Sequence, residues 1–250
     1  SYRKLTSMNF AEIKDILGAA FHEDIDPFSD TRNDLNGDLR KFQGDKFNYR
    51  YETTASDLEA FAQIRYAAKK WDAFISGNFA NINYQREGLF QNERFLETSL
   101  GKSEPLRFTT FGLKAGGTYN ISGRHTLRMH GAYAKRPPLL QNVFINPREN
   151  NKVVENLQEE TLSAVDLSYF LRLPDLTGRL TAFYTRFQNS TDVNFFFVDA
   201  GVGSDFVQEV LTNLDRLHKG LELGLEYQVS ATVKLSFVGN YGNYVFASDP

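Results

Sequence analysis

The sequence predicts an all-β protein, an antiparallel up-and-down meander of long strands of the kind that forms transmembrane β-barrels. Three observations predict it. Apolar and polar residues alternate in a series of segments over most of the chain after residue 45. The connections between these segments are alternately short and long, and aromatic residues gather near the short connections. Alternation places successive side chains on opposite faces of a strand. Short turns at one end and long loops at the other are typical of transmembrane barrels.

Composition excludes several other classes. The 250 residues include no cysteine, so neither disulfides nor thiolate metal sites can form. The net charge of −3 lacks the basic excess that nucleic-acid binding usually requires, and we expect no nucleic-acid partner. Apolar runs such as Phe195–Val198 fall far below the roughly 18 residues that a transmembrane helix needs.

The first 45 residues differ from the rest in being rich in Asp, Asn, Lys and Arg. They contain one run with helical character, Phe10–Leu17, which Gly18 would end. We therefore expect residues 1–45 to form a long extracellular loop segment with a short helix, and residues 46–250 to form the partial barrel.

Eight alternating segments follow. In one of them Leu221, Leu223 and Leu225 alternate with Glu222 and Glu226, and proline falls outside all of the segments, as expected for strands that must donate every backbone N–H. The predicted strands are 46–68, 71–87, 106–121, 124–136, 158–173, 178–196, 211–229 and 233–247.

The connections between these strands alternate in length. Tight turns are expected at 68–70, 122–124, 174–177 and 230–232, and long polar loops at 88–105, 137–157 and 197–210. A soluble sandwich has no reason to keep this asymmetry, whereas a barrel with periplasmic turns and extracellular loops does.

The alternation also predicts which face meets lipid. Trp71 and Tyr119 lie beside short turns, and Phe79 and Phe111 follow on the same face eight residues further along their strands. Eight residues of a strand tilted by roughly 40° climb on the order of 20 Å, close to the ~25 Å apolar band between two aromatic girdles. The polar positions should then face the lumen, and the expected lumen-facing residues are Gln63, Arg65, Lys114, Arg128, His130, Asp166, Glu222 and Glu226.

No motif in the sequence indicates catalysis. The histidines, His22, His125, His130 and His218, show no metal-ligand spacing, and the sequence contains no nucleophile elbow, phosphate-binding loop or dinucleotide fingerprint. We expect no metal, no cofactor and no enzymatic activity. The apolar loop run 136–147 is expected to pack on neighbouring loops, although contact with a ligand or a partner lid is open.

Several segments, each weak alone, together resemble the barrels of TonB-dependent receptors of the Bacteroidetes type. The segments that carry the resemblance, in order along nearly the whole chain, are 1–4, 16–18, 44–49, 60–66, 71–77, 84–86, 113–120, 133–137, 155–157 (continuing through Leu167) and 220–223.

The resemblance implies a cell-outer-membrane transporter for a scarce nutrient such as a glycan, a peptide or a siderophore. Its barrel would have 22 strands, closed by an N-terminal plug that the TonB complex opens, and its partners would be outer-membrane lipid, that complex and a possible surface lipoprotein lid. Because eight strands are too few for such a barrel, we expect this chain to be an internal piece without the plug. By resemblance, ligand contacts are expected at Arg50, Tyr84, Arg86, Arg136 and Asn142.

Two alternatives remain open at this point. A complete eight-stranded structural or adhesive outer-membrane barrel is an allowed architecture, although its strands need only about 9–11 residues. A soluble β-sandwich that binds carbohydrate would use the apolar face as its core.

Overall fold

The computed structural model describes residues 1–199 and 204–248. Within these ranges one antiparallel ten-stranded sheet dominates, and its strands follow the chain in order except for the short β8, which pairs with β7 beside the main path. The strands of this sheet are β1 (Tyr2–Glu12), β6 (Lys46–Ala67), β7 (Trp71–Gly88), β8 (Gly101–Lys102), β9 (Leu106–Asn120), β10 (His125–Arg136), β11 (Glu160–Arg172), β12 (Leu176–Asp199), β13 (Ser204–Gln228) and β14 (Lys234–Phe246).

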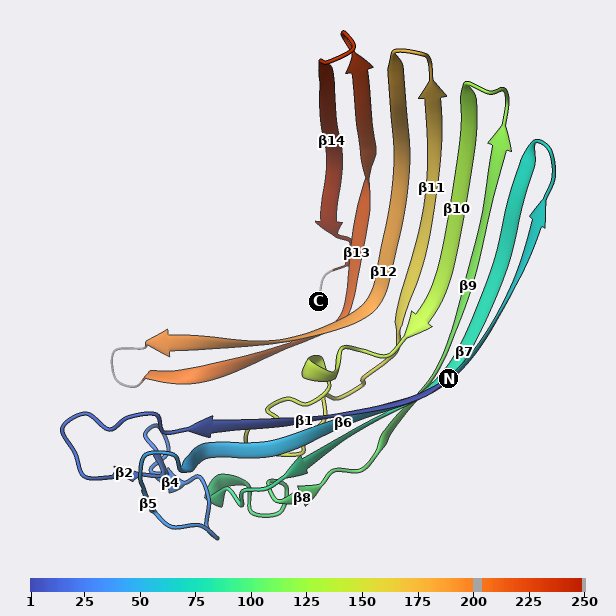
Figure 1. Ribbon diagram of the computed structural model, residues 1–250. Coiled ribbons are helices and arrows are strands. Elements are labelled where there is room, and N and C mark those ends of the chain that lie inside the picture. The colour runs from blue at the N-terminus through green and yellow to red at the C-terminus, as the bar shows by residue number, and fades with distance from the viewer. Residues whose placement is uncertain (200–203, 249–250) are drawn as a thin grey trace.

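The sheet curves into an open wall, with β1 and β14 as its two edges (Figure 1). All eight predicted strands are present, and the predicted fold class, a partial antiparallel barrel, is confirmed. A single curved wall is not the two-layer sandwich that the sequence left open, and strands of up to 25 residues exceed what a small eight-stranded barrel needs. In the described ranges, no helix has the length and apolar character needed to cross a membrane.

The prediction for the first 45 residues was wrong in two respects. Residues 2–12 are not loop but the edge strand β1, which pairs with β6 from Tyr2↔Leu58 to Glu12↔Lys46. The expected helix over Phe10–Leu17 does not form, because pairing with β6 supplies hydrogen bonds that an isolated two-turn helix lacks. Beyond the strand, Ile13 exchanges backbone hydrogen bonds with Gly44 and Asp45, of 2.8 and 3.0 Å.

The remaining part of that segment, up to residue 45, is a loop, as expected. It contains the two-residue strands β2 (His22–Glu23) and β5 (Arg40–Lys41), which pair with each other, and β3 (Ile25–Asp26) and β4 (Thr31–Arg32), which do likewise.

The long loop predicted at 197–210 is also a correction. β12 and β13 continue up to Asp199 and from Ser204, and residues 200–203 of the predicted loop lie outside the described residues. Two register shifts, after Phe187 and after Ser190, bend this hairpin away from the wall (Figure 1). Asn189 and Asn213 adopt positive φ of 58° and 57° at the bend, a conformation that asparagine tolerates better than most residues. Residues 197–199 and 204–210 are therefore part of the two strands rather than of a loop.

The strand register divides the side chains of the wall into two sets. Lys114 pairs with Ala132, His130 with both Gly116 and Asp166, and Thr181 with Glu222, so these residues share one face. All eight predicted lumen-facing positions fall on this face, which we call the inner face. Leu113, Tyr119, Leu167, Leu223 and Leu225 fall on the opposite, outer face.

Most of the fully buried side chains lie among the long loops and the strand ends beside them, at the end of the wall that we call upper and that is drawn at the bottom of Figure 1. Val143, Phe144 and Val154 are buried in the loop between β10 and β11, together with Leu214 of β13. This loop includes the short 3-10 helix η2 (Leu140–Asn142), and the loop between β7 and β9 includes η1 (Glu93–Phe95). The loops thus form their own small core at the upper end of the wall.

Candidate functional site

Ion pairs and hydrogen bonds between neighbouring strands join many of the charged and polar side chains on the inner face. Arg65 donates to Asp72 with its Nε at 3.1 Å, Arg179 Nη2 lies 3.4 Å from Glu222, and His130 Nδ1 lies 3.4 Å from Asp166. Two further charges of this face also have contacts: Lys234 Nζ lies 2.8 Å from Glu226, and the Arg128 guanidinium lies 4.9 Å from the centre of the Phe170 ring. These contacts stabilise the pairing of the strands.

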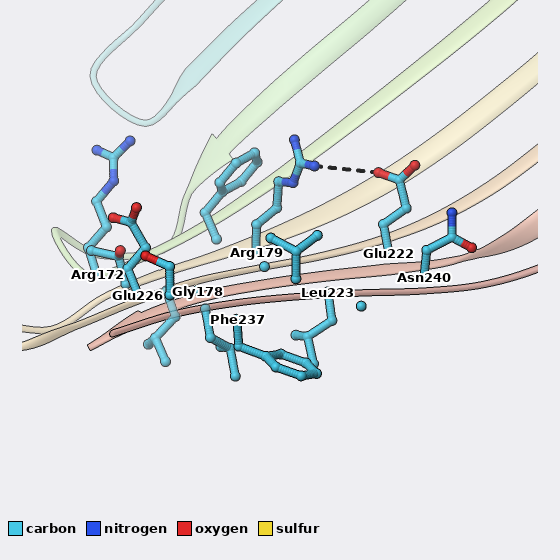
Figure 2. Close-up of a pocket in the computed structure, with 16 residues that line it drawn as sticks. Arg172, Gly178, Arg179, Glu222, Leu223, Glu226, Phe237 and Asn240 are labelled. Carbon is cyan, nitrogen blue, oxygen red and sulfur yellow. Dashed lines mark hydrogen bonds and ion pairs between the residues drawn. The ribbon is translucent and has the colours of Figure 1, made fainter. Parts of the chain in front are cut away.

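Two shallow hollows lie along the inner face, near the short turns. One, of about 490 Å³, is lined by β11 to β14. Figure 2 shows Arg179, Glu222 and Asn240 rising on one side of the sheet and Leu223 and Phe237 on the other. The second hollow, of about 520 Å³, includes Gln63, Arg65, Arg128 and His130. In the described residues, no cluster of three or more His, Asp or Glu side chains is placed to hold a metal ion.

Glycines opposite aromatic rings shape the middle of the inner face. A Cβ at Gly116 would lie 2.6 Å from the Phe74 ring, and one at Gly220 would lie 3.0 Å from the Phe183 ring and 2.4 Å from the Tyr241 carbonyl oxygen. The aromatic rings therefore lie flat across the neighbouring strand, which requires glycine at those two positions.

Arg86, expected as a ligand contact, is instead a buried anchor for two loops. Its side chain is only 1% exposed, and Nε donates to the carbonyl of Pro147 at 2.6 Å. Its Nη1 donates to the carbonyl of Ser99 at 3.1 Å and to Asn151 Oδ1 at 2.6 Å, and the guanidinium lies 5.2 Å from the centre of the Tyr51 ring. Burial lowers the pKa of Arg86 to about 10. Contact with a ligand would require the loops to separate.

Asn142 clamps the same loop to the other side of the wall. It is 6% exposed, and its Nδ2 donates to the Thr191 carbonyl at 2.7 Å and to Asp192 Oδ1 at 3.2 Å. The loop between β10 and β11 is thus held at two separate points. Arg86 of β7 binds it at one point, and Asn142, which belongs to the loop, binds β12 at the other. The apolar run 136–147 packs within the loops, as the sequence predicted, because Val143 and Phe144 are buried there.

The other three expected ligand contacts are placed differently. Arg136 lies on the inner face, where its Nε donates to Glu160 Oε2 at 2.8 Å and its guanidinium stays about half exposed. Tyr84 is half-buried, with its ring centre 5.6 Å from that of Phe108. Arg50 is exposed, but the register places it on the face opposite to Gln63 and Arg65.

One cluster was missed in the sequence. The exposed Arg148 guanidinium lies 5.0 Å from the centre of the Tyr49 ring, whose own centre is 6.0 Å from that of Tyr51. Burial raises the pKa of Tyr51, and the charge of Arg148 partly opposes this rise. No carboxylate among the described side chains forms an ion pair with Arg148. Only the loop fold brings residue 148 to residues 49 and 51, so no sequence signal reveals the cluster.

The geometry defines a class: one wall of an outer-membrane-type barrel, with a polar inner face and interlocked loops at its upper end. The chain belongs to the TonB-dependent receptor family, because the model described as "TonB dependent receptor-like, beta-barrel" matches residues 5–250. Proteins of this family reside in the outer membrane, interact with TonB and are transporters rather than enzymes.

Solved structures agree on the fold. A structure titled "Copper transporter OprC" superposes with a TM-score of 0.54 at 16% identity, covering 85% of this chain and 32% of that chain. The siderophore receptor PirA from Pseudomonas aeruginosa gives 0.55 at 12% identity, covering 81% and 45%. The chain thus spans less than half the length of either protein. A comparison with curated protein sequences found no match.

Proposed function

We propose that this chain forms part of the barrel wall and outer loops of a TonB-dependent receptor that actively imports a scarce nutrient across the outer membrane. The observation that carries the proposal is the division of one curved wall into a charged inner face and an apolar outer face, within a chain that matches the family over residues 5–250. Charged positions suit a wet or plugged lumen, since a charge that faces lipid at the midplane costs about 2–4 kcal/mol.

We place the ligand contacts of this chain at the upper inner face, under the loops. Arg136 and Arg148 present exposed guanidinium groups there, and Tyr84 and Tyr49 present half-buried rings beside them. Cations and aromatic rings together fit a ligand that carries anionic or hydrogen-bonding groups. Glycans, peptides and siderophores all present such groups, and copper and siderophores are named for the two structural neighbours themselves.

The remaining parts of the mechanism lie outside this chain. Energy coupling would pass from TonB through a plug domain, and a surface lipoprotein is a possible lid over the loops. The role of this chain would be to hold the loops by Arg86 and Asn142 while the ligand is captured, and we expect it to catalyse no reaction.

The test is nutrient uptake in the source bacterium. Deleting the gene should slow growth when one nutrient limits it, tested in turn with a single glycan, a peptide mixture and a ferric siderophore. Deleting TonB as well should add no further defect for that nutrient. A growth defect that persists unchanged in cells without TonB, or uptake that does not depend on the gene under any of the three conditions, contradicts the proposal.

A further inference from the structure

A buried lysine and a buried aspartate lie side by side in the loop between β1 and β6. β2 and β5 pair through His22↔Lys41, and the Asp24 N–H extends this ladder by donating to the Leu39 carbonyl at 2.9 Å. Asp24 and Lys41 are therefore diagonal neighbours on one face of the strand pair, where long side chains can reach one another. Asp24 is 2% exposed and Lys41 is 8% exposed, so both charged groups are removed from water.

Their geometry is not that of an ordinary buried ion pair. Lys41 Nζ lies 3.9 Å from Asp24 Oδ2, which is beyond hydrogen-bond distance. That oxygen is buried and has no hydrogen-bond partner in the described part of the chain. Burial of two charges is repaid only where good hydrogen bonds join them. Transfer of a proton from the ammonium to the carboxylate would remove both charges and leave an amine beside a carboxylic acid.

The other oxygen of the same carboxyl group is held by two donors. Asp24 Oδ1 accepts from Asn33 Nδ2 at 2.9 Å and from the backbone N–H of Asn48 at 2.8 Å. These donors fix the orientation of the carboxyl group. They would also stabilise the negative charge that develops on Oδ1 when a nucleophile adds to the carboxyl carbon.

A second carboxylate stands beside the amine. Asp34 and Lys41 both lie against Gly37, where a Cβ would be 2.6 Å from Asp34 Oδ2 and 3.1 Å from Lys41 Nζ. Glycine at position 37 thus leaves the space that the two groups occupy. Asp34 is 9% exposed and is close enough to the amine to relay a proton, directly or through one water. The centre of the Phe90 ring lies 5.6 Å from Lys41 Nζ and adds an apolar surface to the site.

We propose that Lys41 and Asp24 join in an isopeptide bond. The lone pair of the neutral Nζ attacks Asp24 Cγ, the N–C bond forms, and the bond from Cγ to Oδ2 breaks. Oδ2 leaves as water, with the proton of the carboxylic acid and one proton of the amine, which Asp34 relays. The reaction needs no metal, oxidant or cofactor, and it occurs once in each molecule without turnover.

The bond would close the loop covalently from residue 24 to residue 41. In a chain without cysteine, this gives the loop the kind of covalent closure that a disulfide provides elsewhere. The inference does not rest on the imported nutrient or on the proposed role of the wall, so its failure would leave both unchanged.

The test is peptide mapping of the full-length receptor, purified in detergent, denatured and digested with trypsin. Trypsin cuts after Lys14, Arg32, Arg40 and Lys46, but not after a lysine whose amine is acylated. Mass spectrometry of the wild type should find residues 15–32 joined to residues 41–46, lighter by one water than the two peptides together. Separate peptides without the joined species would overturn the inference. A link between 41–46 and 33–40 would also overturn it, because the acceptor would then be Asp34.

Three variants test the roles of the side chains. Lys41→Arg keeps the positive charge but should abolish the joined peptide, and a joined species in this variant would place the link elsewhere. Asp34→Asn should slow bond formation about 100-fold after synthesis, as expected for loss of a proton relay. The matched control Asp38→Asn removes the same charge from an exposed position in the same loop and should form the bond like the wild type. Equal rates in the two Asp→Asn variants would refute the relay by Asp34.

Discussion

Replacing Arg86 by methionine should release the two loops that its guanidinium holds together. Three hydrogen bonds from a charged group contribute about 1.5 kcal/mol each. Burial, which lowers the pKa of Arg86 to about 10, costs about 3 kcal/mol and offsets most of this gain, so the net contribution of Arg86 to folding is only about 1.5 kcal/mol. The larger effect comes from the partners, because methionine fills the space but leaves one buried and two part-buried acceptors without donors.

Each orphaned acceptor costs at least about 1 kcal/mol, so the loops should lose about 3 kcal/mol of local stability. Local opening should therefore become about 100-fold more frequent. Hydrogen exchange of the full-length protein should show this acceleration in peptides covering residues 89–105 and 139–157. Peptides from the paired strands β10 and β11 should not change, since Arg86 makes no contact there.

The matched control is Arg94→Met, because Arg94 lies in the same loop region but is exposed, with its guanidinium 5.6 Å from the centre of the Phe95 ring. Exchange in Arg94→Met should match the wild type. Unchanged protection in Arg86→Met, or equal acceleration in both variants, would show that Arg86 does not hold the loops.

Three further predictions follow from the same geometry. Gly220→Ala should lower the stability of the folded protein by about 2 kcal/mol in thermal unfolding, because a Cβ there would lie 2.4 Å from the Tyr241 carbonyl oxygen. The control Gly224→Ala has open space around the new Cβ and should change stability by less than about 0.5 kcal/mol. Protection of the loop amides from hydrogen exchange should be independent of pH from 6 to 9. Burial lowers the pKa of Arg86 to about 10, so its contribution makes stability rise with pH only above about 10, and a change in protection within pH 6–9 would show that another group holds the loops. Arg148→Gln should weaken binding of the imported nutrient about tenfold in equilibrium titration and leave hydrogen exchange of residues 139–157 unchanged. Faster exchange in these residues would show that Arg148 stabilises the loop rather than binds the ligand.

The wall of the barrel was predictable because its physical signal is local. A strand that meets lipid on one side and polar surroundings on the other must alternate with period two, and a one-residue slip would exchange the two faces. Leu223 and Glu222 therefore lie on opposite faces, as the register shows, and which face meets lipid stays a prediction. The short turns followed from the same pattern.

The errors arose where the determining contacts are distant in sequence. β1 is polar and its partner begins more than 30 residues later, so nothing within residues 2–12 announces a strand. Arg86 has the alternation of an inner-face residue, yet the loops around Ser99 and Pro147 bury it. The Tyr49, Tyr51 and Arg148 cluster depends on the same loop fold. Loop packing thus decides which upper residues stay open to a ligand, and local periodicity carries no information about it.

The central claim is that the chain is a membrane-spanning wall with one face toward lipid and the other toward the lumen. Nitroxide labels placed one at a time at positions 217–226 of the full-length receptor in lipid bilayers test it directly, through collision with oxygen and with a water-soluble nickel reagent. Labels at 221, 223 and 225 should favour oxygen, and labels at 220, 222 and 224 should favour nickel. Equal accessibility at neighbouring positions, or the opposite phase, would contradict the account.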